Sequence, residues 1–258
     1  GYYALASISY LSEVVIPAGV TTIKGVAFGG CTDLRTVIIP EGVTELGYSA
    51  FSNCWNLETI NIPKGVTSIP GSAFDGCSNL KSIVLPPTIE FIGGWAFGGC
   101  GSLKELRIPS SVRRIEDGAF GGTNIDDVYV YVIEPFDINQ HTFAMTDNNF
   151  IGTLHAPKVS YWNYYYNTQW SQFLDFEEFD EPYENFYLEG DKDLNKETGG
   201  IRGEEGENPD AELGDASGLT VKDDIVQDLG NVDIEHNGED GASMIVGGTG
   251  GINAESLN

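Results

Sequence analysis

Basic side chains are scarce in this sequence. Its 258 residues include 13 lysines and arginines against 39 aspartates and glutamates, and the formal net charge is −26. Binding to nucleic acid or to an anionic membrane surface needs the opposite sign, because cations must neutralise phosphate groups. We therefore expect no nucleic-acid partner.

Long apolar runs are also missing, although apolar residues make up 41% of the chain and are sufficient for a core. No run approaches the roughly 20 residues that cross a bilayer, so the sequence predicts no membrane-spanning segment. A secretory signal is not recognisable either. Because the chain opens on Gly1 rather than methionine, we expect a trimmed N-terminus and infer nothing about secretion from the missing signal.

Catalytic motifs are the third absence. The three histidines, His141, His155 and His236, are scattered, and none lies in a nucleophile–base pattern. The glycine run at 247–251 lacks the lysine of a phosphate-binding loop. A carboxylate pair of the glycosidase kind stays open, since acids are abundant, but solubility explains the acids of the repeats adequately. We expect no enzyme activity, no catalytic residues and no cofactor.

Cysteines are few but evenly spaced. Ala-Phe-x-x-Cys occurs at 27–31, 50–54, 73–77 and 96–100, and a fifth copy at 119–123 ends in threonine. Each copy begins 23 residues after the last, and this period lies within the 20–29 residues of leucine-rich repeats. One such repeat cannot bury its own apolar stripe, so neighbouring repeats must stack.

The remaining positions of the repeat predict strands. Each copy reads L-x-x-V/I-x-I-P, then a polar turn and V-x-x-I, and the apolar-x-apolar step is typical of a strand that turns alternate side chains inward. Proline ends the strand because it has no amide donor. The predicted fold is a mainly β solenoid, a right-handed stack of about six rungs with a short-helix cap, followed by a small β-rich module.

Two inward ladders follow from the repeat. We expect the Ala-Phe phenylalanines to stack, and the four cysteines to form a second buried column beside them. Disulfides and a zinc site are the alternatives. Rungs about 4.8 Å apart exceed the usual Cβ separation of a disulfide, and zinc ligands must converge on one point. Buried free thiols are favoured, and no metal ligands are predicted.

Residues 4–130, with "IPAGVTTIKGVAFGGCTDLRTVIIP" at 16–40 as the clearest copy, resemble the BspA-like leucine-rich repeat family. The tail at 153–179 resembles that family's terminal element, a strand, a short aromatic helix, a tryptophan and a final strand. The resemblance implies a secreted or cell-surface protein of host-associated bacteria, which adheres to host or extracellular proteins.

The aromatic tail also makes physical sense as a lid, because the last rung of a solenoid exposes core. We expect residues 1–181 to form the repeat domain, with 131–181 as its cap. The covering side chains would be Tyr161, Trp162, Tyr164, Tyr165, Tyr166, Trp170 and Phe173. The same cluster could instead be a platform on which sugars stack.

Residues 182–258 differ in composition, with 19 acids, 4 bases and frequent glycine. Short strands are predicted at 219–221, 231–235 and 242–246, which indicates an acidic, glycine-rich β module or the opening of a longer one. Alternating Asp191, Asp193, Asn195 and Glu197 resemble half a calcium loop. Lys196 and Arg202 occupy the places of its glycine and its last glutamate, so a solvated turn is favoured.

Binding by repeat proteins usually uses the sheet surface. The outward column on the predicted strands consists of Val15, Ile38, Asn61, Val84, Arg107 and Tyr129, and the flanking column adds the cations Arg35, Lys81 and Lys104. Strand propensity and protection of a sheet edge explain the same residues equally well. We expect a non-catalytic adhesion module that binds an extracellular or host protein through this face. The alternative is a carbohydrate-binding surface protein that uses the aromatic cluster or the C-terminal module to bind polysaccharide.

Overall fold

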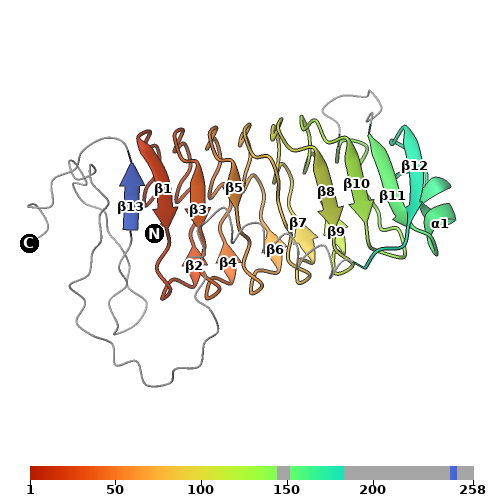
Figure 1. The fold of residues 1–258 in the computed structure, drawn as a ribbon, viewed down its shortest axis with the longest axis horizontal. Helices are drawn as coiled ribbons and strands as arrows, with labels where there is room; N and C mark the ends of the chain where they lie inside the picture. Colours follow the sequence, from red (N-terminus) through yellow and green to blue (C-terminus); the bar gives the residue numbers. More distant parts are fainter. Residues whose placement is uncertain (144–151, 183–244, 249–258) are drawn as a thin grey trace, which may run out of the picture.

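The computed structural model describes residues 1–143 and 152–182, together with the backbone of 245–248. It shows an elongated β-solenoid in which the strands follow one another along the long axis, from the N-terminal rung to the helix α1 at the far end (Figure 1). The predicted fold class is confirmed for this part of the chain.

One long side of the solenoid is a series of parallel strands that we call the main sheet. Its members are β1 (Leu11–Val15), β3 (Thr36–Ile38), β5 (Thr59–Ile60), β8 (Glu105–Ile108), β10 (Asp127–Val130), β11 (Thr153–Pro157) and β12 (Asp175–Phe179). They form two hydrogen-bonded groups, one with β1, β3 and β5 and one with β8, β10, β11 and β12, and the rung between them, which carries Val84, has no regular strand. Val14 lies opposite Val37, and Val37 lies opposite Ile60, so the register equals the repeat length. Strands β11 and β12 lie in the predicted cap and continue the stack beyond the six predicted rungs.

Shorter strands line a second side, seen below the main sheet in Figure 1. They are β2 (Thr22–Ile23), β4 (Glu45–Leu46), β6 (Ser68–Ile69), β7 (Phe91–Ile92) and β9 (Arg114–Ile115), and all of their pairings are parallel. Each contains the last apolar residue of a V-x-x-I step, and this residue is buried in all five strands.

The phenylalanine ladder is confirmed and is one ring longer than predicted. Phe28, Phe51, Phe74, Phe97 and Phe120 stack in sequence, and Phe143 continues the column. Ring centroids lie 5.1 to 5.6 Å apart, and the planes of neighbouring rings differ by 12° or less. Like residues stack because each occupies the same place in successive turns.

The four cysteines are free and buried, as predicted. Their role is more polar than that of a small apolar side chain, because each thiol donates a hydrogen bond to a backbone carbonyl of the preceding rung. The Sγ of Cys54 lies 3.1 Å from the oxygen of Phe28, and the Sγ of Cys77 lies 3.2 Å from that of Phe51. Thr123, at the same place in the fifth copy, bonds instead to Phe120 in its own turn, at 2.8 Å.

Backbone geometry also repeats with the period of 23. The residue before each Ala-Phe pair at Val26, Ser49, Ser72, Trp95 and Gly118 has a positive φ, and so has Tyr3 at the same place before Ala4-Leu5. Val26 has φ 58°, in the left-handed region that β-branched residues avoid. The neighbouring rungs hold this backbone in place, since Val26 donates its N–H to Tyr48 at 3.0 Å.

We expect Val26→Gly to stabilise the solenoid by about 1 kcal/mol, because glycine adopts this conformation without steric cost. Urea unfolding followed by circular dichroism measures the effect. Val159→Gly is the matched control, because Val159 is 77% exposed and its φ is not positive. There the added freedom of the unfolded chain should cost about 0.5–1 kcal/mol. Equal losses of stability in both variants would show that Val26 is unstrained.

The cap consists of β11, β12 and the short helix α1 (Tyr161–Tyr165) between them. Tyr164, Trp170 and Phe173 are buried and close the end of the core. The hydroxyl of Tyr164 donates to the carbonyl of Val132 at 2.8 Å, and the indole Nε1 of Trp170 donates to that of Phe136 at 2.9 Å. The predicted lid therefore covers the last rung.

The lid prediction was wrong for three of its seven aromatic residues. Trp162, Tyr165 and Tyr166 are exposed, and Tyr161 is only partly buried. A helix buries one stripe of its surface, and in α1 this stripe consists of Tyr164 alone. The tail thus has a covering side and a separate exposed aromatic side.

The backbone segment β13 (Ile245–Gly248) pairs antiparallel with β1, at the N-terminal edge of the main sheet. It overlaps the last of the three predicted strands, and it adds to the repeat domain. The other two strands and the calcium-like segment at 191–197 lie outside the described residues. The C-terminal β module as a separate domain remains a prediction.

Candidate functional site: the outer face of the main sheet

The predicted binding column lies on the outer face of the main sheet, the face that points away from the core. Val15, Ile38, Val84, Arg107 and Tyr129 are all partly exposed there. Aliphatic and aromatic side chains therefore do reach the surface, on strands whose inward residues are almost completely buried.

Asn61 corrects this prediction, because it is only 8% exposed. Its side-chain amide turns along the sheet and pairs with the backbone of Ile39. The Oδ1 accepts the N–H of Ile39 at 2.8 Å, and the Nδ2 donates to its carbonyl at 2.7 Å. The side-chain amide thus makes the two hydrogen bonds with Ile39 that a peptide group could make, and it does not face a partner.

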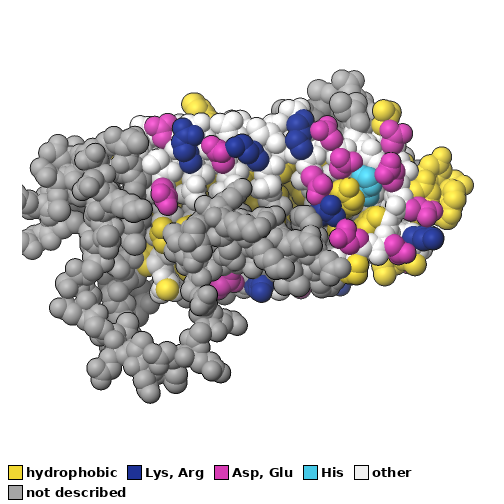
Figure 2. Space-filling model, viewed as in Figure 1, with side chains coloured by type: hydrophobic (Ala, Val, Ile, Leu, Met, Phe, Trp, Pro, Cys, Tyr) yellow, Lys and Arg dark blue, Asp and Glu magenta, His cyan; other side chains and the backbone are white. Residues whose placement is uncertain are grey.

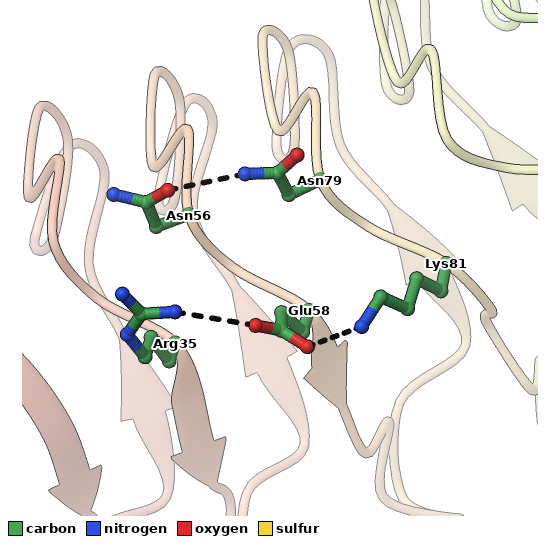
Figure 3. A network of polar contacts seen from close by, with 5 residues as sticks. All are labelled: Arg35, Asn56, Glu58, Asn79 and Lys81. Carbon is green, nitrogen blue, oxygen red and sulfur yellow. Dashed lines mark hydrogen bonds and ion pairs between the residues drawn. The ribbon is translucent and has the colours of Figure 1, made fainter.

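The flanking cations are exposed but not free to act as a positive strip. Glu58 lies between Arg35 and Lys81 and contacts both, at 3.3 Å to Arg35, while the amides of Asn56 and Asn79 bond beside them (Figure 3). Lys104 lies 3.5 Å from Asp126. The hydrogen bond from Lys81 is the main cause that lowers the pKa of Glu58. The predicted concentration of positive charge is thus balanced by acids of neighbouring rungs.

Near the C-terminal end, the same outward column becomes a stack of planar groups. The guanidinium of Arg107 lies 3.9 Å from the ring centre of Tyr129, which in turn lies 4.1 Å from that of His155. Cation–π attraction and ring stacking hold these three side chains in line across β8, β10 and β11. Figure 2 shows several acidic side chains gathered on this face towards the end of the solenoid that carries α1.

Acids fix the ends of this stack. The Nε of Arg107 lies 2.7 Å from Glu105, and its Nη1 donates to the hydroxyl of Tyr131 at 2.8 Å. The two ring nitrogens of His155 lie 2.8 Å from Asp127 and 3.4 Å from Glu177. Ring stacking, a cation–π contact and ion pairs hold the three side chains together, and they are partly buried. The arrangement was missed in part by the sequence reasoning, because His155 joins the column only when the loop after Tyr131 is skipped.

A second row of apolar side chains lies beside the stack. Tyr131, buried in the outer face, packs against Val84, Tyr129 and Phe179. The ring of Phe179 meets Tyr131 edge-on at 4.8 Å and Tyr129 at 5.7 Å. We call these four residues the outer cluster. It lies outside the main core, and Val84 is therefore a packing residue as well as a surface residue.

A hollow of about 250 Å³ opens next to the outer cluster, where β10, β11 and β12 end. Its apolar walls are formed by Tyr131, Ile133, Pro157, Val159 and Phe179. The acidic residues Asp180 and Glu181, which directly follow β12, also line this hollow. No sequence pattern indicated it, because its walls come from strand ends and turns that lie outside the 23-residue repeat.

The exposed aromatic residues of α1 form a separate patch at the end of the solenoid. Trp162 and Tyr166 stack with their ring centres 5.7 Å apart, and Tyr165 meets both edge-on. Because the rings stack on one another, they do not form the side-by-side platform that a sugar chain would need.

Metal binding and membrane insertion find no support in the part of the chain that the structure describes. Residues 1–143 and 152–182 contain no group of three or more His, Cys, Asp or Glu side chains placed to hold a metal ion. Among the described helices, none has the length and apolar character to cross a bilayer.

Comparisons with known proteins agree with this geometry. The BspA type leucine rich repeat region matches residues 1–126 in six copies, whereas no curated protein matches the chain. A leucine rich repeat protein of T. pallidum is 25% identical, with a TM-score of 0.46, over 66% of this chain and 70% of that one. The pneumococcal vaccine antigen PcpA is 18% identical, with a TM-score of 0.55, over 68% of this chain and 42% of that one, and shows a similar fold. Residues 1–126 are therefore a BspA-type leucine-rich repeat region.

Proposed function

We propose that this chain is a non-catalytic binding module of a secreted or cell-surface bacterial protein, and that it binds an extracellular or host protein through the outer face of the main sheet. The observation that carries the proposal is the column of partly exposed apolar and aromatic side chains on that face, Val15, Ile38, Val84 and Tyr129. When one face of a sheet is in contact with water, the outward-facing positions of its strands are normally polar.

The chemistry of the C-terminal half supports a protein partner. Tyrosine and arginine are enriched among the residues that dominate protein interfaces, and both are already ordered here by the stack of Arg107, Tyr129 and His155. Pre-ordered side chains lose little conformational entropy when a partner docks. The face as a whole is a long strip, a shape that suits an extended protein surface better than a small molecule.

The test is a pull-down from extracellular and host proteins, followed by affinity measurements with variants. Ile38→Asp should weaken binding by at least ~2 kcal/mol, about 30-fold, because it places a charge in the apolar strip. Thr67→Asp is the matched control, since Thr67 is exposed outside the main sheet. If both variants bind the captured partner as tightly as the parent while staying folded, the outer face is only scaffold.

A second candidate function is carbohydrate binding by the aromatic patch of α1. Trp162 and Tyr166 are 58% and 74% exposed, so ring surface remains for a single sugar unit, although the stacked rings do not form an extended platform. A glycan array probed with the parent and with Trp162→Ala separates the two candidates. Glycan binding that disappears in Trp162→Ala and survives in Ile38→Asp would support this second function.

A further inference from the structure

The hollow beside the outer cluster has walls and a rim of different character. Tyr131 lines it and is 7% exposed, while Ile133 and Val159, which also line it, are 56% and 77% exposed. Asp180 and Glu181 also line it, and both are acidic residues exposed to solvent. An apolar interior with acids at one edge matches a ligand that has an apolar stem and a positive tip.

The local charge balance is negative. Lys158 is exposed between two residues of the wall, and it offsets one carboxylate. Glu134 follows Ile133 and adds a further acid. Arg107, whose guanidinium reaches the hydroxyl of Tyr131, is already paired with Glu105. Nearby charges also affect the phenol of Tyr131. Burial is the main cause that raises its pKa, Arg107 lowers the pKa through a hydrogen bond and its charge, and the charge of Glu181 raises it.

The size of the hollow restricts what can enter. Pockets for whole small molecules usually enclose about 300–1,000 Å³, and this one encloses about 250 Å³. A single long side chain fits that space. Lysine and arginine bury their methylene stems along apolar surface while keeping the charged end near water or an acid.

We propose that the hollow binds the side chain of a lysine or arginine from a protein partner. The stem lies against Tyr131, Phe179 and Ile133, and the cationic end lies at Asp180 and Glu181. This proposal rests on the proposed function for the identity of the partner, because the hollow adjoins the outer face. Its preference for a cation can be measured without any partner, so the two proposals can fail separately.

The experiment is an NMR titration of the whole chain at low salt with three probes, the N-acetyl methylamides of lysine, arginine and norleucine. Norleucine has the same carbon stem as lysine without the charge. We expect millimolar binding of lysine or arginine that is at least fivefold tighter than that of norleucine. Shifted resonances should include those of Tyr131 and Phe179, and binding should weaken as salt screens the acids.

The double variant Asp180→Asn/Glu181→Gln should reduce the affinity for the cationic probes at least fivefold. Glu178→Gln is the matched control, because Glu178 is an exposed acid on the same strand and points to the opposite face from Phe179. Norleucine binding as tight as that of lysine and arginine, unchanged affinity in the double variant, or no cation binding up to high millimolar concentration each overturns the proposal. None of these results depends on Ile38, whose substitution tests the outer face itself.

Discussion

Replacing Trp170 with alanine is expected to lower the free energy of unfolding by about 3–5 kcal/mol. Trp170 is completely buried and lies among the rings of Phe136, Tyr164 and Phe173, with ring centres 5.5, 5.0 and 6.3 Å away. The substitution leaves a cavity and also removes the partner of the Phe136 carbonyl. A loss of this size is a large part of the 5–15 kcal/mol that stabilises a typical domain.

Trp162→Ala is the matched control, because Trp162 lies eight residues earlier and is 58% exposed. Its replacement should change the unfolding free energy by less than about 0.5 kcal/mol. Urea unfolding of both variants, followed by circular dichroism, gives the comparison. Equal effects of the two substitutions would mean that the aromatic tail does not close the core.

The second large effect expected is loss of stability in alkali, because the cysteine ladder must stay protonated. Burial raises the pKa of Cys31 from 9.0 to about 11 and that of Cys100 to about 12, and it raises the pKa values of Cys54 and Cys77 as well. Unfolded thiols ionise near pH 9, so this stabilising contribution is complete below pH 9 and is lost as the pH rises towards 11 and 12. Each thiol costs about 1.4 kcal/mol per pH unit within that window.

Four such thiols give a slope on the order of 5 kcal/mol per pH unit above pH 9. Urea unfolding at pH 7, 9 and 10 measures it. Cys77→Ala should cost about 1–2 kcal/mol at pH 7, where it removes a packed sulfur, and it should reduce the alkaline slope by roughly a quarter. Because Tyr164 titrates in both proteins, the difference between them isolates the thiol. An unchanged slope in Cys77→Ala would show that this thiol does not titrate with unfolding.

Most of the fold could be predicted from the sequence because the repeat length is constant. A constant period puts equal residues above one another, so the inward columns, the phenylalanine stack and the cysteine column all follow from counting. The hydrogen bonds of the thiols could not be predicted, since they depend on how close each sulfur lies to the carbonyl of the rung before it.

The candidate site was predicted less well, for identifiable reasons. Counting placed Asn61 on the outer face, but a side-chain amide can fold back onto a neighbouring strand, as it does at Ile39. The prediction of a positive strip considered the cations but not the acids in the same column, although Glu58 lies one rung from both Arg35 and Lys81. The hollow is built from turns and a strand end outside the period, where counting gives no information.

The uniform phenylalanine stack has a consequence for the length of the molecule. Phe51 meets Phe28 at 5.1 Å and Phe74 at 5.6 Å, with the same 2° between planes, so neighbouring turns present nearly interchangeable surfaces. Gain or loss of one whole 23-residue unit therefore keeps every ring in contact. It moves the apolar strip near Ile38 relative to the hollow at Glu181 by one strand spacing, about 4.8 Å. The number of repeats therefore sets the distance between the apolar strip and the hollow in discrete steps. A partner that contacts both places would be sensitive to the number of repeats.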